Sequence, residues 1–141
     1  MKTARRIPIV QGVFEETPEG PRLLGSRCTG CGVAYFPRIP VCRNPACDEK
    51  RVEDIYLSPR GTIWSYTVQY FKPPLPARFD EPFQPYAVAM VDLPERIRVL
   101  AMVSTDQPEN LQIGQDVELV IDTAYHDDEG NEVVTWKFRP L

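Results

Sequence analysis

All four cysteines of this chain lie inside one short window, and their spacing is that of a metal site. Cys28 and Cys31 are separated by two residues, Cys42 and Cys47 by four, and ten residues separate the two pairs. Both spacings let neighbouring thiolates point at one ion, and four thiolates satisfy a tetrahedral zinc. A closed set of four cysteines leaves no position for a substrate, so we expect a structural Zn²⁺ site rather than a catalytic one.

Two disulfides, or a redox role for the first pair, are the alternatives to zinc. Residues 28–50 contain too few apolar side chains for a core of their own, so a metal or disulfides must hold them. Residues 1–12 begin basic but lack the apolar stretch of a secretion signal, which favours a reducing compartment and therefore zinc. A thioredoxin-like role for Cys28 and Cys31 requires a βαβ context, which the pattern does not offer.

Few other residues could act as a nucleophile or a base. His126 is the single histidine, and it lies in an acidic turn with residues 127–129. No G-x-S-x-G, HExxH, Walker or G-x-G-x-x-G pattern occurs. A weaker hypothesis is a stand-alone enzyme that uses carboxylates which no spacing pairs, namely Asp80, Glu81, Asp92 or Asp122. We expect that the chain is not catalytic on its own.

The elements that must position these residues are mainly β-strands. Alternating and β-branched segments bounded by turns predict strands at 52–57, 62–70, 86–93, 97–104, 117–124 and 132–138. No segment after residue 51 keeps a helical period. Five or six short strands in about 90 residues favour a small antiparallel barrel, of which the OB-fold is the usual five-stranded form. The fold class expected is therefore mainly β, with a four-Cys zinc ribbon followed by an OB-fold barrel.

This pattern divides the chain into two parts. We expect an N-terminal extension and zinc ribbon at residues 1–50, and an OB-fold domain at residues 51–141. The turn at 17–20 predicts a short β-hairpin that leads into residue 28, with a short N-terminal helix as the alternative.

One long loop stands out within the second part. Residues 71–85 contain five of the 15 prolines, three phenylalanines and two cations. Proline cannot donate to a sheet ladder, so this segment is a stiff loop, and loops of this length are commonly functional. The loop either contacts a partner or folds its aromatic rings onto its own barrel.

Composition limits the classes of partner. The 141 residues include 16 Lys and Arg against 20 Asp and Glu, a formal net charge of −4, which disfavours general coating of nucleic acids. The runner-up function is nonetheless single-stranded nucleic-acid binding, because Trp64, Tyr66 and Tyr70 could stack on bases. No window reaches the length of apolar residues that a membrane span needs, so we expect a soluble, cytoplasmic protein without a membrane partner.

Several motifs together resemble a known family, over about residues 21–140. They are Cys28-Thr-Gly-Cys31-Gly32, Phe36-Pro37-Arg38, the second cysteine pair, Gly61-Thr62-Ile63-Trp64-Ser65-Tyr66-Thr67-Val68, residues 85–93, residues 111–117 and residues 136–140. The chain resembles a family whose members join a rubredoxin-like zinc ribbon to an acyl-CoA-associated OB-fold domain. The chain departs from it in the wider second cysteine pair, where two intervening residues are more usual, and in a short or replaced N-terminal helix.

The resemblance implies a role in an enzyme complex. Members of the family are small subunits of thiolase or aldolase complexes, such as benzoylsuccinyl-CoA thiolase, and hydratases occur among their partners. For this chain, the resemblance implies a non-catalytic accessory subunit that docks on a thiolase-like catalytic subunit. The two would form a hetero-oligomer in which this chain helps to shape an acyl-CoA site. Coenzyme A carries phosphates and adenine, which cations near aromatic rings recognise, so the candidates for acyl-CoA or partner contact are Arg38, Lys72 and Arg78.

Overall fold

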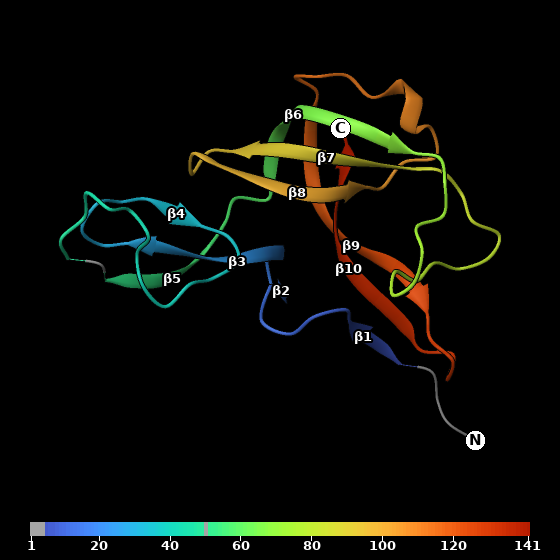
Figure 1. The fold of residues 1–141 in the computed structure, drawn as a ribbon, viewed down its shortest axis with the longest axis horizontal. Coiled ribbons are helices and arrows are strands. Elements are labelled where there is room, and N and C mark those ends of the chain that lie inside the picture. The colour runs from blue at the N-terminus through green and yellow to red at the C-terminus, as the bar shows by residue number, and fades with distance from the viewer. Residues whose placement is uncertain (1–4, 50) are drawn as a thin grey trace.

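Ten β-strands and one short 3₁₀ helix form the protein in this computed structural model, which describes residues 5–49 and 51–141. The elements are β1 (Arg6–Pro8), β2 (Phe14–Thr17), β3 (Gly20–Cys28), β4 (Ala34–Tyr35), β5 (Val52–Tyr56), β6 (Arg60–Gln69), β7 (Tyr86–Leu93), β8 (Ile97–Val103), η1 (Pro108–Asn110), β9 (Asp116–His126) and β10 (Glu132–Pro140). Strands β3–β5 form a small lobe beside a larger one built from β6–β10 (Figure 1). Within the described ranges, no helix is long and apolar enough to cross a membrane.

The larger lobe is a closed five-stranded barrel. Strands β6, β7 and β8 are consecutive antiparallel neighbours, and β9 pairs with both β6 and β10. A short parallel pairing of β8 with β10, at Lys137↔Met102 and Phe138↔Val103, completes the ring. Closure removes the open edges that a flat sheet would leave. The expected OB-fold barrel is confirmed, and β1 extends it by pairing in parallel with β10.

Alternation along the strands fills the barrel. On β7, the four residues Ala87, Ala89, Val91 and Leu93 are buried, whereas the residues between them are partly exposed. This period of two sends every second side chain to one core. The core also contains Leu23, Leu57, Ile63, Val99, Ala101, Val103, Leu111, Val117, Leu119 and Phe138.

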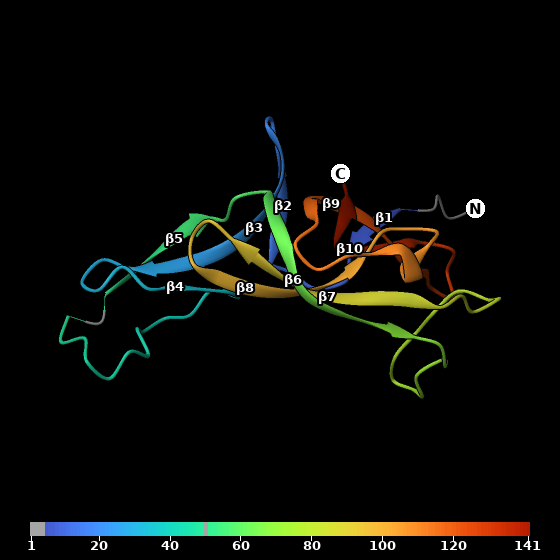
Figure 2. The same cartoon turned by 90° about the horizontal axis from the view of Figure 1, so that it is seen from above.

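The smaller lobe is a sheet centred on β3. Strand β2 forms a hairpin with β3 through the turn at 17–20, so the expected hairpin is confirmed and the helical alternative is wrong for the residues described. Strands β4 and β5 both pair with the second half of β3. Figure 2 shows this sheet extending away from the barrel, with the cysteine-bearing loops at its far end.

The strand expected at 52–57 pairs with the ribbon and not with the barrel. Residues of β5 match Leu24–Cys28 of β3 in antiparallel register. Directly after β5, the backbone N–H of Leu57 donates to the carbonyl of Leu23 at 3.0 Å, and both side chains enter the barrel core. The ribbon lobe therefore packs against the barrel core through the first half of β3 and the residue after β5. The division at residue 50 stays a prediction, and this pairing favours a boundary after Tyr56.

The proline-rich loop divides into a packed half and an exposed half. Phe79, Phe83 and Tyr86 form an aromatic cluster with centroid distances of 5.3–6.0 Å. By contrast, Leu75 is 82% exposed and Phe71 is 80% exposed. Part of the loop thus folds on itself and on the start of β7, and the other part projects outward (Figure 2).

Candidate metal centre and contact surfaces

The structure brings the four cysteine side chains together at the end of the ribbon. Cys28 ends β3, Cys31 follows in the first turn, and Cys42 and Cys47 lie in the loop between β4 and β5. All four Sγ atoms lie within 4.8 Å of one another, with 3.5 Å between Cys28 and Cys47 and 3.7 Å between Cys31 and Cys42. Zn–S bonds of about 2.3 Å place tetrahedral thiolates about 3.8 Å apart, so the donor set fits zinc.

Backbone hydrogen bonds shape both cysteine loops. In the first, the N–H of Gly32 donates to the carbonyl of Cys28 at 2.9 Å, and Gly32 has a positive φ of 78°. In the second, the N–H of Cys47 donates to the carbonyl of Asn44 at 3.0 Å. A Cβ on Gly30 would lie 2.9 Å from the Cβ of Glu49 and 3.3 Å from the Sγ of Cys47. The wider second pair is therefore accommodated by a turn that still presents both thiols.

Donors around the cluster favour thiolates at two positions. The backbone N–H of Val33 lowers the pKa of Cys31 to about 6. The Tyr35 hydroxyl, followed by the N–H of Asn44, lowers the pKa of Cys42. For Cys28, the N–H of Cys31 lowers the pKa, but burial and the thiols of Cys47 and Cys42 outweigh it and raise the pKa to about 11. Three buried thiols and one exposed thiol, with thiolates favoured at Cys31 and Cys42, suit a cation that compensates the negative charge.

The three cations expected to contact acyl-CoA or a partner are not gathered into one site. Arg38 lies in the ribbon and forms an ion pair of 3.1 Å with Asp54 on β5. Lys72 pairs with Glu81 inside the proline-rich loop. Arg78 reaches from the same loop to Asp128 at 3.0 Å, beyond the end of β9, and lies over the Tyr125 ring. Each cation already has a carboxylate partner, all at least partly exposed.

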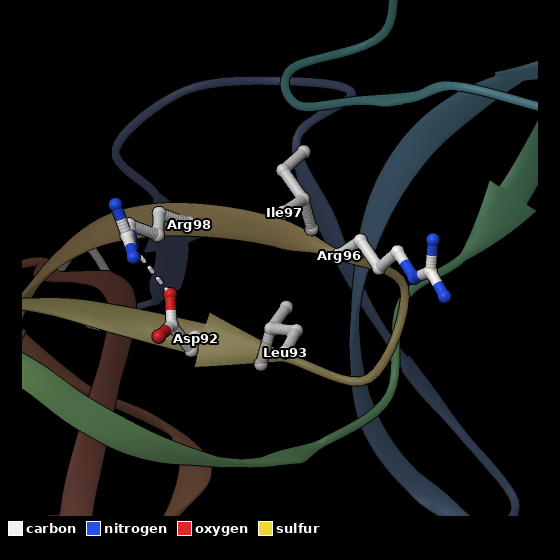
Figure 3. Close-up of a pocket in the computed structure, with 5 residues that line it drawn as sticks. All are labelled: Asp92, Leu93, Arg96, Ile97 and Arg98. Carbon is white, nitrogen blue, oxygen red and sulfur yellow. Dashed lines mark hydrogen bonds and ion pairs between the residues drawn. The ribbon is translucent and has the colours of Figure 1, made fainter. Parts of the chain in front are cut away.

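Two arginines of the β7–β8 hairpin were not among the contact residues predicted from the sequence. Arg98 pairs with Asp92 at 2.6 Å and lies 3.8 Å from the ring centroid of Trp64. Arg96, in the turn, donates its backbone N–H to the carbonyl of Leu93 at 3.0 Å, but its guanidinium has no ion-pair or hydrogen-bond partner among the residues described. Figure 3 shows the two side chains pointing to opposite sides of an open hollow of about 560 Å³. The turn signal at 94–96 was visible in the sequence, but nothing in it marked these cations.

The residues considered for catalysis are dispersed. His126 forms two hydrogen bonds with the carboxylate of Asp80. Its backbone N–H donates to Oδ1 at 2.7 Å, and its Nδ1 lies 2.6 Å from Oδ2. Asp122 accepts from Ser104 at 3.0 Å and lies 3.6 Å from the Nζ of Lys137. Glu81 and Asp92 are paired with the cations described above. No two of these four carboxylates are joined by an interaction in the described part of the chain.

The aromatic residues considered for base stacking have different environments. The hydroxyl of Tyr66 donates to the carbonyl of Leu111 at 2.7 Å, and its ring packs against the core. Trp64 is 47% exposed but is covered on one face by Arg98, while Tyr70 is exposed next to the proline-rich loop. They do not form one continuous platform.

A four-cysteine ribbon joined to a closed five-stranded barrel defines a zinc-ribbon and OB-fold protein, and comparison with known proteins specifies the family. Residues 20–53 match the rubredoxin-like zinc ribbon domain of ChsH2, and residues 54–122 match the C-terminal OB-fold domain of ChsH2. The chain belongs to this family, which includes DUF35 domain-containing scaffold proteins.

Relatives match most of the chain. A DUF35 domain-containing scaffold protein of Methanocaldococcus jannaschii is 34% identical over 84% of this chain and 82% of that protein. The benzoylsuccinyl-CoA thiolase subunit BbsA of Thauera aromatica is 30% identical over 86% of this chain and 78% of its own length. The solved structure of an Ltp2-ChsH2(DUF35) aldolase superposes with a TM-score of 0.63, at 32% identity and 84% coverage of both chains.

Proposed function

We propose that this chain is a zinc-stabilised accessory subunit of a thiolase-fold acyl-CoA enzyme, either a thiolase or an aldolase. The observation that carries the proposal is the shared two-part architecture over most of the chain's length. The relatives include a subunit named for benzoylsuccinyl-CoA thiolase and a chain of an aldolase assembly. The chain would dock on a catalytic subunit in a cytoplasmic hetero-oligomer and help to shape its acyl-CoA site.

The distribution of nucleophiles supports an accessory rather than a catalytic role. Thiolase chemistry needs an activated cysteine nucleophile and bases beside it. All four cysteines of this sequence enter one cluster, and the single histidine is bonded to Asp80 at the surface. The catalytic groups would therefore come from the partner.

Zinc would be held by Cys28, Cys31, Cys42 and Cys47. The fit of the four Sγ atoms supports these ligands, and a bound Zn²⁺ supplies structural cross-linking rather than a Lewis acid for substrate. The ribbon has a small core of its own, with Tyr35 and Val52 packed against the three buried cysteines. Metal binding would therefore contribute much of its folding free energy.

Arg38, Lys72 and Arg78 remain our candidates for contact with acyl-CoA or the partner. Each is paired with an exposed carboxylate, so contact with a phosphate would require exchange of one anion for another. Arg96 joins them, since its guanidinium has no partner in the described residues. Cations at a rim raise association rates and specificity more than affinity.

Co-purification of the tagged chain from its native host, with mass spectrometry of what it retains, tests the proposal. We expect a stoichiometric polypeptide whose own sequence carries thiolase-fold catalytic cysteine and histidine residues. The isolated chain should show no thiolysis of acetoacetyl-CoA and no aldol cleavage. Turnover by the isolated chain, or a retained complex that contains only nucleic acid, would contradict the proposal.

A further inference from the structure

A cleft lies between the proline-rich loop and the outer wall of the barrel. Its volume is about 380 Å³, within the usual range for small-ligand sites. The walls are mainly apolar and come from five separate segments of the chain. They include Ile9, Pro76, Phe79, Met102 and Ala124.

Two hydroxyl groups interrupt this apolar lining. Thr135 on β10 lines the cleft and is only 7% exposed, and its hydroxyl has no hydrogen-bond partner in residues 5–49 and 51–141. The Tyr125 hydroxyl on β9 likewise has no hydrogen bond among those residues. A hydroxyl that lines a cleft and has no protein partner is free to donate a hydrogen bond to a ligand acceptor.

The loop that forms one wall is fastened to the barrel on both sides of Phe79. Arg78 pairs with Asp128 at 3.0 Å and lies 5.1 Å from the centroid of the Tyr125 ring. Asp80 accepts the backbone N–H of His126 at 2.7 Å. These contacts hold the wall in place without a ligand, so the cleft is largely preformed.

We propose that this cleft binds the acyl part of a neutral acyl thioester, with the carbonyl oxygen accepting from Thr135. The apolar walls favour a short aliphatic or aryl group. Asp128 compensates the one cation at the mouth, Arg78, so a neutral carbonyl matches the cleft better than a carboxylate does. The choice of a thioester rather than another carbonyl compound rests on the proposed function.

Titration of the isolated full-length chain with hexanoyl-N-acetylcysteamine tests this site, using amide chemical shifts as the readout. We expect saturable shifts centred on Ala77, Met102 and Ala124, with N-acetylcysteamine alone producing none. Thr135→Val should weaken binding about 10-fold, as expected for loss of about one hydrogen bond. The matched control Thr67→Val changes an exposed threonine on β6 and should bind as the parent does.

A second variant keeps the test decisive if Thr135→Val fails to fold. Ala124→Trp fills the cleft from its β9 wall and should abolish the saturable shifts. Equal or tighter binding of hexanoate would overturn the preference for a neutral carbonyl, and absence of saturable shifts with the thioester would overturn the site. Because no catalytic partner is present, failure here is distinguishable from failure to co-purify with a thiolase-fold subunit.

Discussion

The hydroxyl oxygen of Tyr35 lies 3.3 Å from the Sγ of Cys42. The same oxygen accepts the backbone N–H of Arg43 at 3.0 Å, which leaves its own proton to donate toward the sulfur. The Tyr35 ring packs against the buried cysteines. Tyr35 therefore combines packing with a hydrogen bond to a candidate zinc ligand, the arrangement that usually orients a ligand from outside the coordination shell.

Replacement of Tyr35 by phenylalanine should weaken zinc binding while the ribbon still folds. The ring and its packing remain, but the donor to Cys42 is lost. Loss of such outer partners commonly lowers metal affinity by about 10-fold or more. Competition with a chromogenic chelator measures the affinity.

Tyr56→Phe is the matched control for that experiment. Tyr56 lies on β5 of the same sheet, and its hydroxyl donates to Glu15, away from the cysteines. This variant should retain the parent's zinc affinity. Equal affinity of the Tyr35→Phe variant and the parent would contradict a role for the hydroxyl.

Replacement of Cys42 by serine should remove the metal from the ribbon. Three thiolates and a hydroxyl hold zinc far less tightly than four thiolates, and folding of the ribbon is coupled to metal binding. Elemental analysis should show about one zinc per parent chain and little in the variant. Amide exchange should increase in β4 and β5.

Thr29→Ala provides a control next to a ligand, because Thr29 follows Cys28, is exposed, and its hydroxyl donates only a long hydrogen bond of 3.4 Å to the carbonyl of Arg51. That variant should keep its zinc. Oxidised disulfides in the purified parent, with no zinc, would instead support the two-disulfide alternative.

A carboxylate holds the connection between the two lobes. The Oε2 of Glu95, in the β7–β8 turn, accepts the N–H of Ser58 at 3.0 Å and its hydroxyl at 2.7 Å. Glu95→Ala leaves these donors unpaired and should lower the free energy of unfolding by about 1–3 kcal/mol. Glu95→Gln keeps an acceptor and should lose less.

Urea unfolding measures both Glu95 variants. Glu109→Ala, at an exposed position in η1, is the control and should change stability little. If Glu95→Ala were as stable as that control, the contact to Ser58 would contribute nothing to the fold.

Local pattern predicted much of this fold because each barrel strand alternates clearly. The segment expected at 86–93 matches β7 residue for residue, and the cysteine spacing predicted the cluster that the structure forms. The segment expected at 52–57 pairs with β3 of the ribbon, which the sequence could not indicate because β-propensity does not specify a pairing partner. The cleft at Thr135 was equally invisible, since its walls come from segments that only tertiary folding brings together.

The bond between Asp80 and His126 gives the proline-rich loop a pH-dependent attachment. The backbone N–H of His126, followed by its imidazole, lowers the pKa of Asp80 below its usual value. A carboxyl with a lowered pKa in the folded state stabilises that state above its unfolded pKa. The contribution is lost as pH falls through the folded pKa. The pair is about half exposed, so solvent screening keeps the contribution small.

Comparison of the parent with Asp80→Asn therefore yields a difference in stability that depends on pH. The parent should be the more stable protein at about pH 5, and the difference should shrink as the pH falls below the usual aspartate pKa of about 3.9 and the carboxyl becomes protonated. Urea unfolding at stepped pH measures it. Asp106→Asn, at an exposed carboxyl without a hydrogen bond in the described residues, should show no such trend. A difference for Asp80→Asn that stays constant across this range would mean that the charge of Asp80 does not fasten the loop.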